Sequence, residues 1–505
     1  MRIQKKENTL ALGFIKFILL VAPFIVGWLG FLLEGFNNQD AAYSSFQLYF
    51  ANIPATSENE VYNVLVEIGR WTAPVVAVAI GISLIVELVN GELWPIIWSK
   101  LPGKYMVYGD SEVIGMLCPD SSNPFSRYCI VKENRYVRCK KYVLLFNQDK
   151  DNLDFYSRIL LPKISDNEDV QVYMKVQDLA QQDLQDSKIT SFQIDDYIAS
   201  SFYKNKKWID YMYSFAENSE PVRIAIIGFG ILGIHMLETG VSLNLVSTKQ
   251  KVEYHIWGDT DEYRAMHSWM TGNEIVPDRI VFHDKRWYSE MPIIEDMNCI
   301  ILCDEQTENI HVLSDLLRLT NVSGRGTRIY VFTDNEDTLK LFQIKHFSVS
   351  IAKGEKENSF IVGEDNQLSA FGFPHDGHFL EHILSNDEDI SREAKCKHER
   401  YVNEQSKKNQ ERTYFGWEKL NAFTRWDNIM SASLDDTRKY LIDKYAISKE
   451  ESAELEHIRW VRSHYINGWT FSENRNDALK KHPQMKEFYM LSDEEKEKDD
   501  NIRGT

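Results

Sequence analysis

Two long apolar segments lie near the N-terminus, and most of the remaining chain has the mixed apolar and polar pattern of a soluble protein. Residues Leu10 to Leu33 carry one charge, Lys16, and residues Trp71 to Val89 carry one, Glu87. A helix needs roughly 20 apolar residues to cross the hydrocarbon core of a bilayer. The pattern therefore predicts two spanning helices in a transmembrane unit over residues 1–100.

The charges around these segments predict the orientation of the protein. Arg2 and Lys5 precede the first segment, Lys100 and Lys104 follow the second, and the loop between them is acidic. Because positive charge is retained on the cytoplasmic side, we expect a multi-pass inner-membrane protein that contacts lipid and has both termini in the cytoplasm. The first segment is too long for a cleavable signal peptide and lacks an A-x-A site.

The loop over residues 35–70 has a pattern of its own. Aromatic residues recur at close to helical spacing, at Tyr43, Phe46, Tyr49 and Phe50, and Asn52 and Pro54 then break the pattern. This arrangement resembles the re-entrant pore loop of tetrameric two-helix channels, with Tyr43, Phe46, Asn52 and Glu87 as candidate pore residues. A solvated acidic loop and a snorkelling Glu87 are the alternatives. The loop has no TVGYG filter, so potassium selectivity is not indicated.

A nucleotide-binding pattern lies at residues 222–233, VRIAIIGFGILG. An apolar strand, Val222 to Ile227, runs into Gly228, Gly230 and Gly233 and then into a helical stretch, which is the G-x-G-x-x-G motif in its required setting. The glycines allow a phosphate to approach the helix N-terminus, where free N–H groups favour anions. A Rossmann turn that keeps its glycines for packing alone is the alternative.

The following residues continue this fold. A strand at Val252 to Trp257 is followed by Asp259, at the place of a ribose-binding acid. Further elements are strands at Arg279 to His283, Asn298 to Cys303 and Arg328 to Thr333, and a helix at Glu308 to Leu319. The alternation of strands and helices predicts a doubly wound parallel sheet over residues 216–385.

Residues 101–215 look like a degraded copy of the same lobe. Lys104 to Leu117 leads a strand into Gly109, but Ser111 and Ile114 occupy the other two glycine positions. Strands are predicted at residues 142–146 and 170–176. The pattern favours a structural role over phosphate binding in this lobe.

Tandem Rossmann lobes after a two-helix membrane unit resemble the RCK (TrkA-N) domains of ligand-gated channels. The resemblance covers about Lys104 to Phe373 and includes Ile189 to Tyr203 as the helix that links the lobes. It implies a ring of domains, here in a homo-oligomer expected to be a tetramer, in which ligand binding moves the lobes and pulls the pore helices.

Two groups of residues raise the question of a metal, and no metal site is assigned. His375, His378 and His382 recur at i, i+3 and i+7 beside Glu381, but a polar surface is the default interpretation because Gly377 interrupts a regular helix. The cysteines contain no CxxC pair, so neither zinc nor disulfides are indicated.

Residues 410–505 contain ELEHIRWVRSHYINGWTF and HPQMKEFYMLSDEEKEKDD. Both stretches resemble the ryanodine-receptor-type (RyR) domain, which implies a small, mainly α module. Aromatic faces beside guanidinium groups suit a nucleotide, so Arg459, Trp460 and Trp469 join the glycine motif as candidate ligand-binding residues. A module whose tryptophans form its core is the alternative.

Charge and motif content exclude two classes of function. The net charge of −18 argues against duplex DNA as a partner. No nucleophile–base pair or paired carboxylate occurs in a motif setting, so we expect no catalytic residues and no enzyme.

The order of domains resembles effectors of nucleotide-signalling antiphage systems, including the Hailong type. The resemblance implies a ligand-gated ion channel that depolarises the cell. Its ligand would be a nucleotide or short oligonucleotide made by a partner nucleotidyltransferase and sensed by the RCK-like and RyR-like domains. The alternatives are a housekeeping cation channel gated by a dinucleotide such as NAD, and a non-conducting membrane-tethered sensor.

Overall fold

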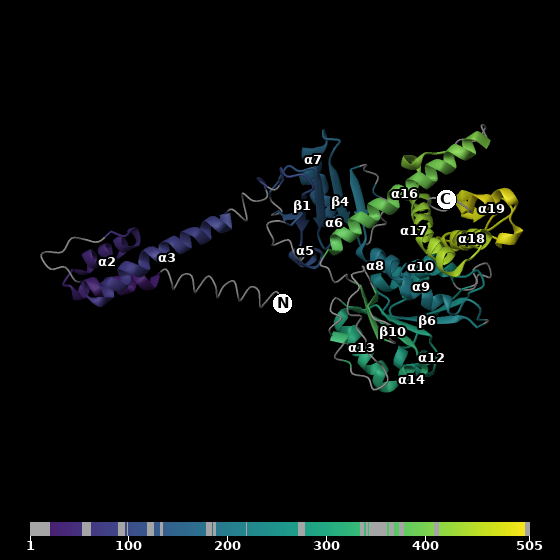
Figure 1. Cartoon of the computed structure of the whole chain (residues 1–505), viewed down its shortest axis with the longest axis horizontal. Coiled ribbons are helices and arrows are strands. Elements are labelled where there is room, and N and C mark those ends of the chain that lie inside the picture. Colours follow the sequence, from purple (N-terminus) through teal and green to yellow (C-terminus); the bar gives the residue numbers. More distant parts are fainter. Residues whose placement is uncertain are drawn as a thin grey trace. The chain divides into compact units, whose positions relative to one another are not determined.

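The computed structural model divides the chain into two compact units (Figure 1). One comprises Met1–Met106 and Cys129–Cys139, and the other comprises Val107–Tyr128 and Lys140–Thr505. The structure describes residues 21–52, 62–88, 96–97, 99–118, 126–131, 135–177, 184, 188–218, 220–270, 278–333, 338–339, 342, 361–362, 368–372, 378–408 and 414–499.

The first unit contains the predicted membrane elements. They are an apolar helical segment Val21–Leu33, α2 (Asn38–Gln47), the 3₁₀ turn η1 (Leu48–Phe50) and α3 (Val64–Leu88). The Asn37 side chain begins α2 by accepting hydrogen bonds from two backbone N–H groups of its first turn. Ala51, in the left-handed conformation, ends η1. The predicted short helix before Asn52 is therefore present, whereas Pro54 lies outside the described residues.

Close packing holds α2 against the neighbouring apolar helices. A Cβ at Gly30 would lie 2.7 Å from the backbone nitrogen of Val66, so glycine allows the first helical segment to approach α3. The Ser45 hydroxyl of α2 donates a hydrogen bond to the Phe24 carbonyl at 2.6 Å. The buried cluster comprises Phe31, Ala41, Leu48, Val66 and Ala73.

One helix in the described part of the chain is long and apolar enough to cross a membrane, at Val64–Ile82 within α3. It begins before the predicted start at Trp71. The helix Val21–Leu33 is shorter, and residues 10–20 of the first predicted span lie outside the described residues. The arrangement with two spans and a re-entrant loop therefore stays a prediction.

The first α/β lobe is built on a sheet with the strand order β2-β1-β3-β4-β5. Its strands are β1 (Tyr105–Gly109), β2 (Tyr128–Ile130), β3 (Lys141–Leu145), β4 (Gln171–Lys175) and β5 (Ile189–Phe192). Its helices are α5 (Ser111–Leu117), α6 (Asp149–Phe155), the π-helical turn η4 (Tyr156–Leu160) and α7 (Leu161–Ile164). Strands β3, β4 and β5 pair in parallel.

The predicted linking helix over Ile189 to Tyr203 is wrong in its first part. Residues Ile189–Phe192 form β5, and the helix α8 covers only Ile194–Tyr203. The β-branched Ile189 and Thr190 suit a strand, and β4 offers them a parallel partner. A second helix, α9 (Lys206–Tyr213), then leads into the next lobe.

The second lobe is a doubly wound parallel sheet, as the sequence predicts. In the described part of the chain its order is β11-β12-β10-β9-β6-β7-β8. All neighbours pair in parallel except β11 and β12. Its strands are β6 (Val222–Ile227), β7 (Val252–Trp257), β8 (Arg279–His283), β9 (Cys299–Leu302), β10 (Arg328–Thr333), β11 (Ile361–Val362) and β12 (Leu368–Gly372). The helices and 3₁₀ turns are α10 (Ile231–Leu243), α11 (Asp261–Met266), η6 (Ser268–Met270), η7 (Trp287–Ser289), α12 (Met291–Ile294), α13 (Gln306–Leu319) and α14 (Val322–Arg325).

The C-terminal part is mainly helical, also as predicted. It comprises α16 (Phe379–Lys408), η8 (Trp417–Lys419), α17 (Ala422–Tyr445), α18 (Lys449–Ile466), β13 (Thr470–Phe471), η9 (Asp477–Leu479), β14 (Lys481–His482), η10 (Phe488–Met490) and α19 (Asp493–Asp499). The long helix α16 packs on α17, and its first half reaches the first lobe (Figure 1). There Glu388 accepts a hydrogen bond from Tyr173 of β4 and lies 3.9 Å from Lys141 of β3.

Candidate functional site

The glycine-rich turn lies where the strand order of the second lobe reverses. Strand β6 ends at Ile227, whose carbonyl accepts a hydrogen bond from Cys303 after β9 at 2.8 Å. On its other side, the Gly228 N–H donates to the Trp257 carbonyl of β7 at 2.9 Å. Gly230 is the N-cap of α10. Ligands of open α/β sheets bind at the carboxyl ends of the strands at such a reversal.

Different physical reasons explain why glycine occupies the three positions of the motif. Gly228 has a φ of +93°, and a Cβ there would lie 2.6 Å from the Asp304 nitrogen. A Cβ at Gly233 would lie 2.3 Å from the Gly228 carbonyl oxygen. Packing therefore requires both. At Gly230 the φ is −84°, and a Cβ would meet nothing within 4 Å. Among the described residues nothing requires glycine at this position, and its small size leaves open space before α10.

The predicted ribose-binding acid lies beside this turn. Gly258 follows β7 with a φ of +153°, and a Cβ there would lie 2.5 Å from the Phe229 nitrogen. Asp259 comes next and is exposed. The structure thus brings Asp259 and the glycines of the motif to one edge of the sheet.

The body of α10 contacts the C-terminal module. It packs against α17 and α18. From α18, the buried Arg462 donates a hydrogen bond through Nη2 to Asp278 Oδ1 at 2.9 Å, and the same oxygen accepts from the Val252 N–H at 3.0 Å. Burial raises the pKa of Asp278, and the charge of Arg462 opposes this rise. Trp269 adds a hydrogen bond from its indole N–H to the Tyr465 carbonyl at 2.8 Å.

Arg459, predicted to meet a phosphate, is buried and paired inside the module. Its Nη1 lies 2.8 Å from Asp427 Oδ1, and its Nη2 lies 2.9 Å from Glu456 Oε1. Burial by itself would raise the pKa of Glu456, but Arg459 and neighbouring cations lower it to about 2. A ligand phosphate would therefore reach Arg459 only by displacing a carboxylate.

Trp460 and Trp469 flank a pair of buried histidines. The centroid of the His464 ring lies 3.9 Å from that of Trp460 and 5.2 Å from that of Trp469. His482, from β14, lies 4.8 Å from Trp460. Burial lowers the pKa of both imidazoles to about 4. The sequence reasoning did not single out these histidines; helical spacing from Trp460 could have found His464, whereas His482 comes from a separate segment.

The candidate pore residues are placed on different elements. Tyr43 and Phe46 lie on α2 and are 65% and 55% exposed. Asn52 follows η1 and is exposed. Glu87 belongs to α3, but its side chain is outside the described residues.

Two further sequence features are the glycine of the first lobe and the histidine cluster near the start of α16. Gly109, the last residue of β1, has a φ of +149°, and a Cβ there would lie 2.3 Å from the Leu145 carbonyl. His378 precedes α16 and lies 3.9 Å from Glu381, while His375 is outside the described residues. No group of three or more His, Cys, Asp or Glu side chains in the described part of the chain is arranged to hold a metal ion.

Comparisons with known proteins identify the C-terminal module. No curated protein and no solved structure matches the chain. The family model of the RyR domain matches residues 432–503, which run from α17 through α19. The module that carries Arg459, Trp460 and Trp469 and packs on α10 is therefore an RyR-type domain.

Proposed function

We propose that the protein is an oligomeric ligand-gated ion channel of the inner membrane, whose RCK-like lobes and RyR domain sense a nucleotide or short oligonucleotide. The observation that carries the proposal is Gly230. Packing accounts for Gly228 and Gly233, whereas Gly230 leaves open space at the N-terminus of α10, where a ligand phosphate has room to approach the backbone N–H groups. Asp259 beside the turn suits a ribose hydroxyl.

The packing of α10 supports a sensor that transmits binding. Its N-terminus faces the proposed ligand, and its body contacts the RyR domain near the buried Arg462–Asp278 pair. The RyR domain in turn packs on α16, which reaches the first lobe through Glu388. A shift of α10 would therefore disturb both neighbours, because packed elements move as units.

The membrane unit supports a pore. A short helix held by hydrogen bonds and glycine contacts between apolar helices is the arrangement of a re-entrant loop. The exposed Tyr43 and Phe46 would face other copies in the oligomer, here a tetramer. As an antiphage effector, such a channel would depolarise the cell when a partner nucleotidyltransferase makes the ligand.

Bilayer currents test this function. Full-length protein is reconstituted, and nucleotides or short oligonucleotides are added on the cytoplasmic side. Ligand should change the current, and Gly230→Asp should abolish the response by bulk and like charge. Gly115→Asp on α5 is the matched control, because a Cβ there also meets nothing within 4 Å. An unchanged response in a folded Gly230→Asp protein would remove the turn as the ligand site.

A membrane-tethered sensor without a pore is the second candidate. It is favoured by the single described helix, Val64–Ile82, that is long and apolar enough to cross a membrane. Nucleotide binding without any current in wild-type protein would establish this alternative and exclude the channel.

A further inference from the structure

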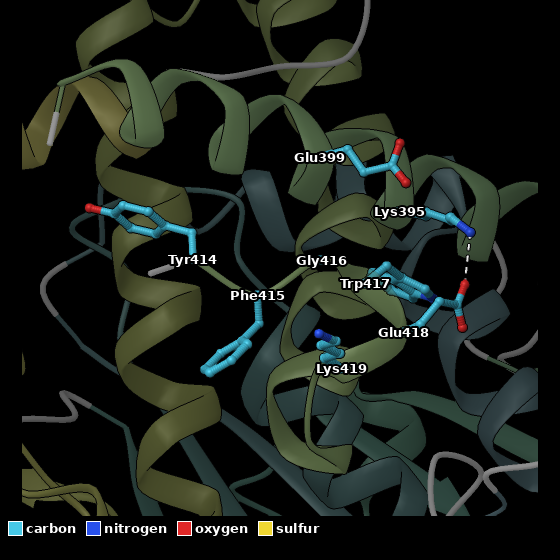
Figure 2. Close-up of a pocket in the computed structure, with 8 residues that line it drawn as sticks. All are labelled: Lys395, Glu399, Tyr414, Phe415, Gly416, Trp417, Glu418 and Lys419. Carbon is cyan, nitrogen blue, oxygen red and sulfur yellow. Dashed lines mark hydrogen bonds and ion pairs between the residues drawn. The ribbon is translucent and has the colours of Figure 1, made fainter. Parts of the chain in front are cut away.

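A cavity outside both predicted ligand sites lies between α16 and the segment that leads into α17 (Figure 2). Its volume is about 350 Å³, which is within the range of small-molecule sites. Lys395 and Glu399 line it from α16, and residues 414–419 line it from the other side. None of these residues belongs to the stretch that matches the RyR domain.

Contacts on both sides hold the cavity wall in place. The His398 imidazole donates a hydrogen bond through Nε2 to the Phe415 carbonyl at 2.9 Å. Lys395 Nζ lies 2.9 Å from Glu418 Oε1, the interaction drawn in Figure 2. The Arg425 guanidinium lies 5.8 Å from the centre of the Trp417 ring. These contacts fix Phe415 and Glu418 against α16, and fixed wall residues reduce the ordering that a ligand must impose.

The glycine in this wall leaves the cavity open. Gly416 has a φ of −68°, which any residue can adopt, and a Cβ there would meet nothing within 4 Å. Trp417 beside it is half-buried and offers a flat ring. Nucleobases stack on such rings, because every base has a flat π-face. The shape therefore suits a planar heterocycle.

The charges of the lining narrow the ligand class further. Lys395 and Glu418 neutralise each other. Within the described part of the chain, neither the Glu399 carboxylate nor the Lys419 ammonium group forms an ion pair, and both are exposed. A lining without net charge does not suit a polyphosphate. It suits a ligand with a hydrogen-bond donor for Glu399 and one phosphate for Lys419.

We propose that this cavity binds an amine-bearing nucleobase. The base stacks on Trp417, its exocyclic amine donates to Glu399, and its phosphate lies beside Lys419. Carboxylates are established acceptors for the amine of cytosine. The inference rests on the proposed function, because it describes how a second site on the protein recognises the base of the nucleotide ligand.

Calorimetry of full-length protein with CMP and UMP tests the inference, since UMP has a carbonyl in place of the amine. CMP should bind at least tenfold more tightly than UMP. Glu399→Gln should narrow this preference to threefold or less, and Gly416→Leu should fill the cavity and weaken CMP binding at least tenfold. Glu404→Gln, exposed on α16 outside the lining, is the matched control and should retain the affinity of the wild type.

The outcomes separate this inference from the proposed function. Unchanged CMP binding in Gly416→Leu and Glu399→Gln proteins with wild-type melting temperatures would overturn the inference. Loss of CMP binding in Gly230→Asp alone would also overturn it, while leaving the turn as the sensor. If tetracytidylate binds more tightly than CMP, the base comes from an oligonucleotide, whereas equal binding indicates a free mononucleotide.

Discussion

Acidification should destabilise the RyR domain through His464 and His482. Both are almost fully buried, and burial lowers the pKa of each from 6.5 to about 4. Between these values the unfolded state binds more protons than the folded state, so stability falls as the pH falls through this window. From pH 7.5 to pH 5 each histidine by itself should lower the free energy of unfolding by about 2 kcal/mol. Because the charge of His464 also lowers the pKa of His482, the two together should lower it by about 3–4 kcal/mol.

The hydrogen bonds explain why the folded domain resists protonation. His482 Nδ1 accepts a hydrogen bond from the Gln484 N–H at 3.2 Å. A proton on this nitrogen would make two N–H donors face each other, and the hydrogen bond would be lost. His464 Nδ1 donates to the Trp460 carbonyl at 2.9 Å. An added proton on His464 must therefore go to Nε2, in a site that burial has desolvated.

Hydrogen exchange of the α18 amides in full-length protein, corrected for intrinsic rates, measures this loss. In the His464→Asn/His482→Asn protein, the amide that replaces the His482 imidazole keeps an acceptor for Gln484. The difference in the free energy of opening between pH 7.5 and pH 5 should shrink by about 3–4 kcal/mol. His311→Gln, on the exposed face of α13, should leave the difference as in the wild type. An equal loss of protection in the wild type and the double variant would refute the reasoning.

Other perturbations follow from the same contacts. Arg462→Met should lower the free energy of unfolding by about 3–5 kcal/mol, because it leaves the Asp278 carboxylate buried and unpaired. The double variant Arg462→Met/Asp278→Leu should recover much of the lost stability, and denaturant titrations measure both changes. Gly233→Ala should lower the melting temperature, because its Cβ would lie 2.3 Å from a carbonyl oxygen, whereas Gly230→Ala should not. Asp210→Asn should weaken the contact between α9 and α17, because Asp210 accepts hydrogen bonds from three side chains of α17. The free energy of local opening should fall by about 1–2 kcal/mol, a value reduced because Asp210 is partly exposed, and amide exchange in α9 should become faster. Burial raises the pKa of Asp210, but hydrogen bonds from α17 outweigh this and lower it, so its contribution is present above its ordinary pKa and is lost in acid.

The sequence predicted the second lobe well because most of its strands are buried, although the edge strand β8 is only partly buried. Continuous apolar runs mark such strands, and the predicted bounds of β6, β7, β8 and β10 are those of the structure. Prediction failed at Ile189 to Phe192, where a strand at the start of a helical pattern depends on the partner strand β4. Prediction from the sequence also missed α16. Most of the residues of this helix are polar, so no long apolar stripe marks it in the sequence.

The candidate site divides in the same way. The motif and the strand before it placed Gly228, Gly230 and Gly233 together, because their spacing is local. The sequence could not show that Gly228 serves packing, since its neighbour Asp304 comes from a distant segment, or that Gly233 meets the Gly228 carbonyl while Gly230 faces open space, since this depends on the shape of the turn. The tryptophans beside it made Arg459 a candidate phosphate ligand, but Asp427 lies on another helix and neutralises it.

By itself, the sequence determined the apolar α3, the alternation that builds a parallel sheet, and the RyR-type module, because periodicity and local motifs encode all three. Only the tertiary structure decided which charges are exposed, which glycine is free, and that α10 lies against α18. The physical reason is that burial and ion pairing depend on residues that are distant in the chain. Burial and pairing set the free energy of a charged group, and the same distant residues decide whether the space around a glycine is filled.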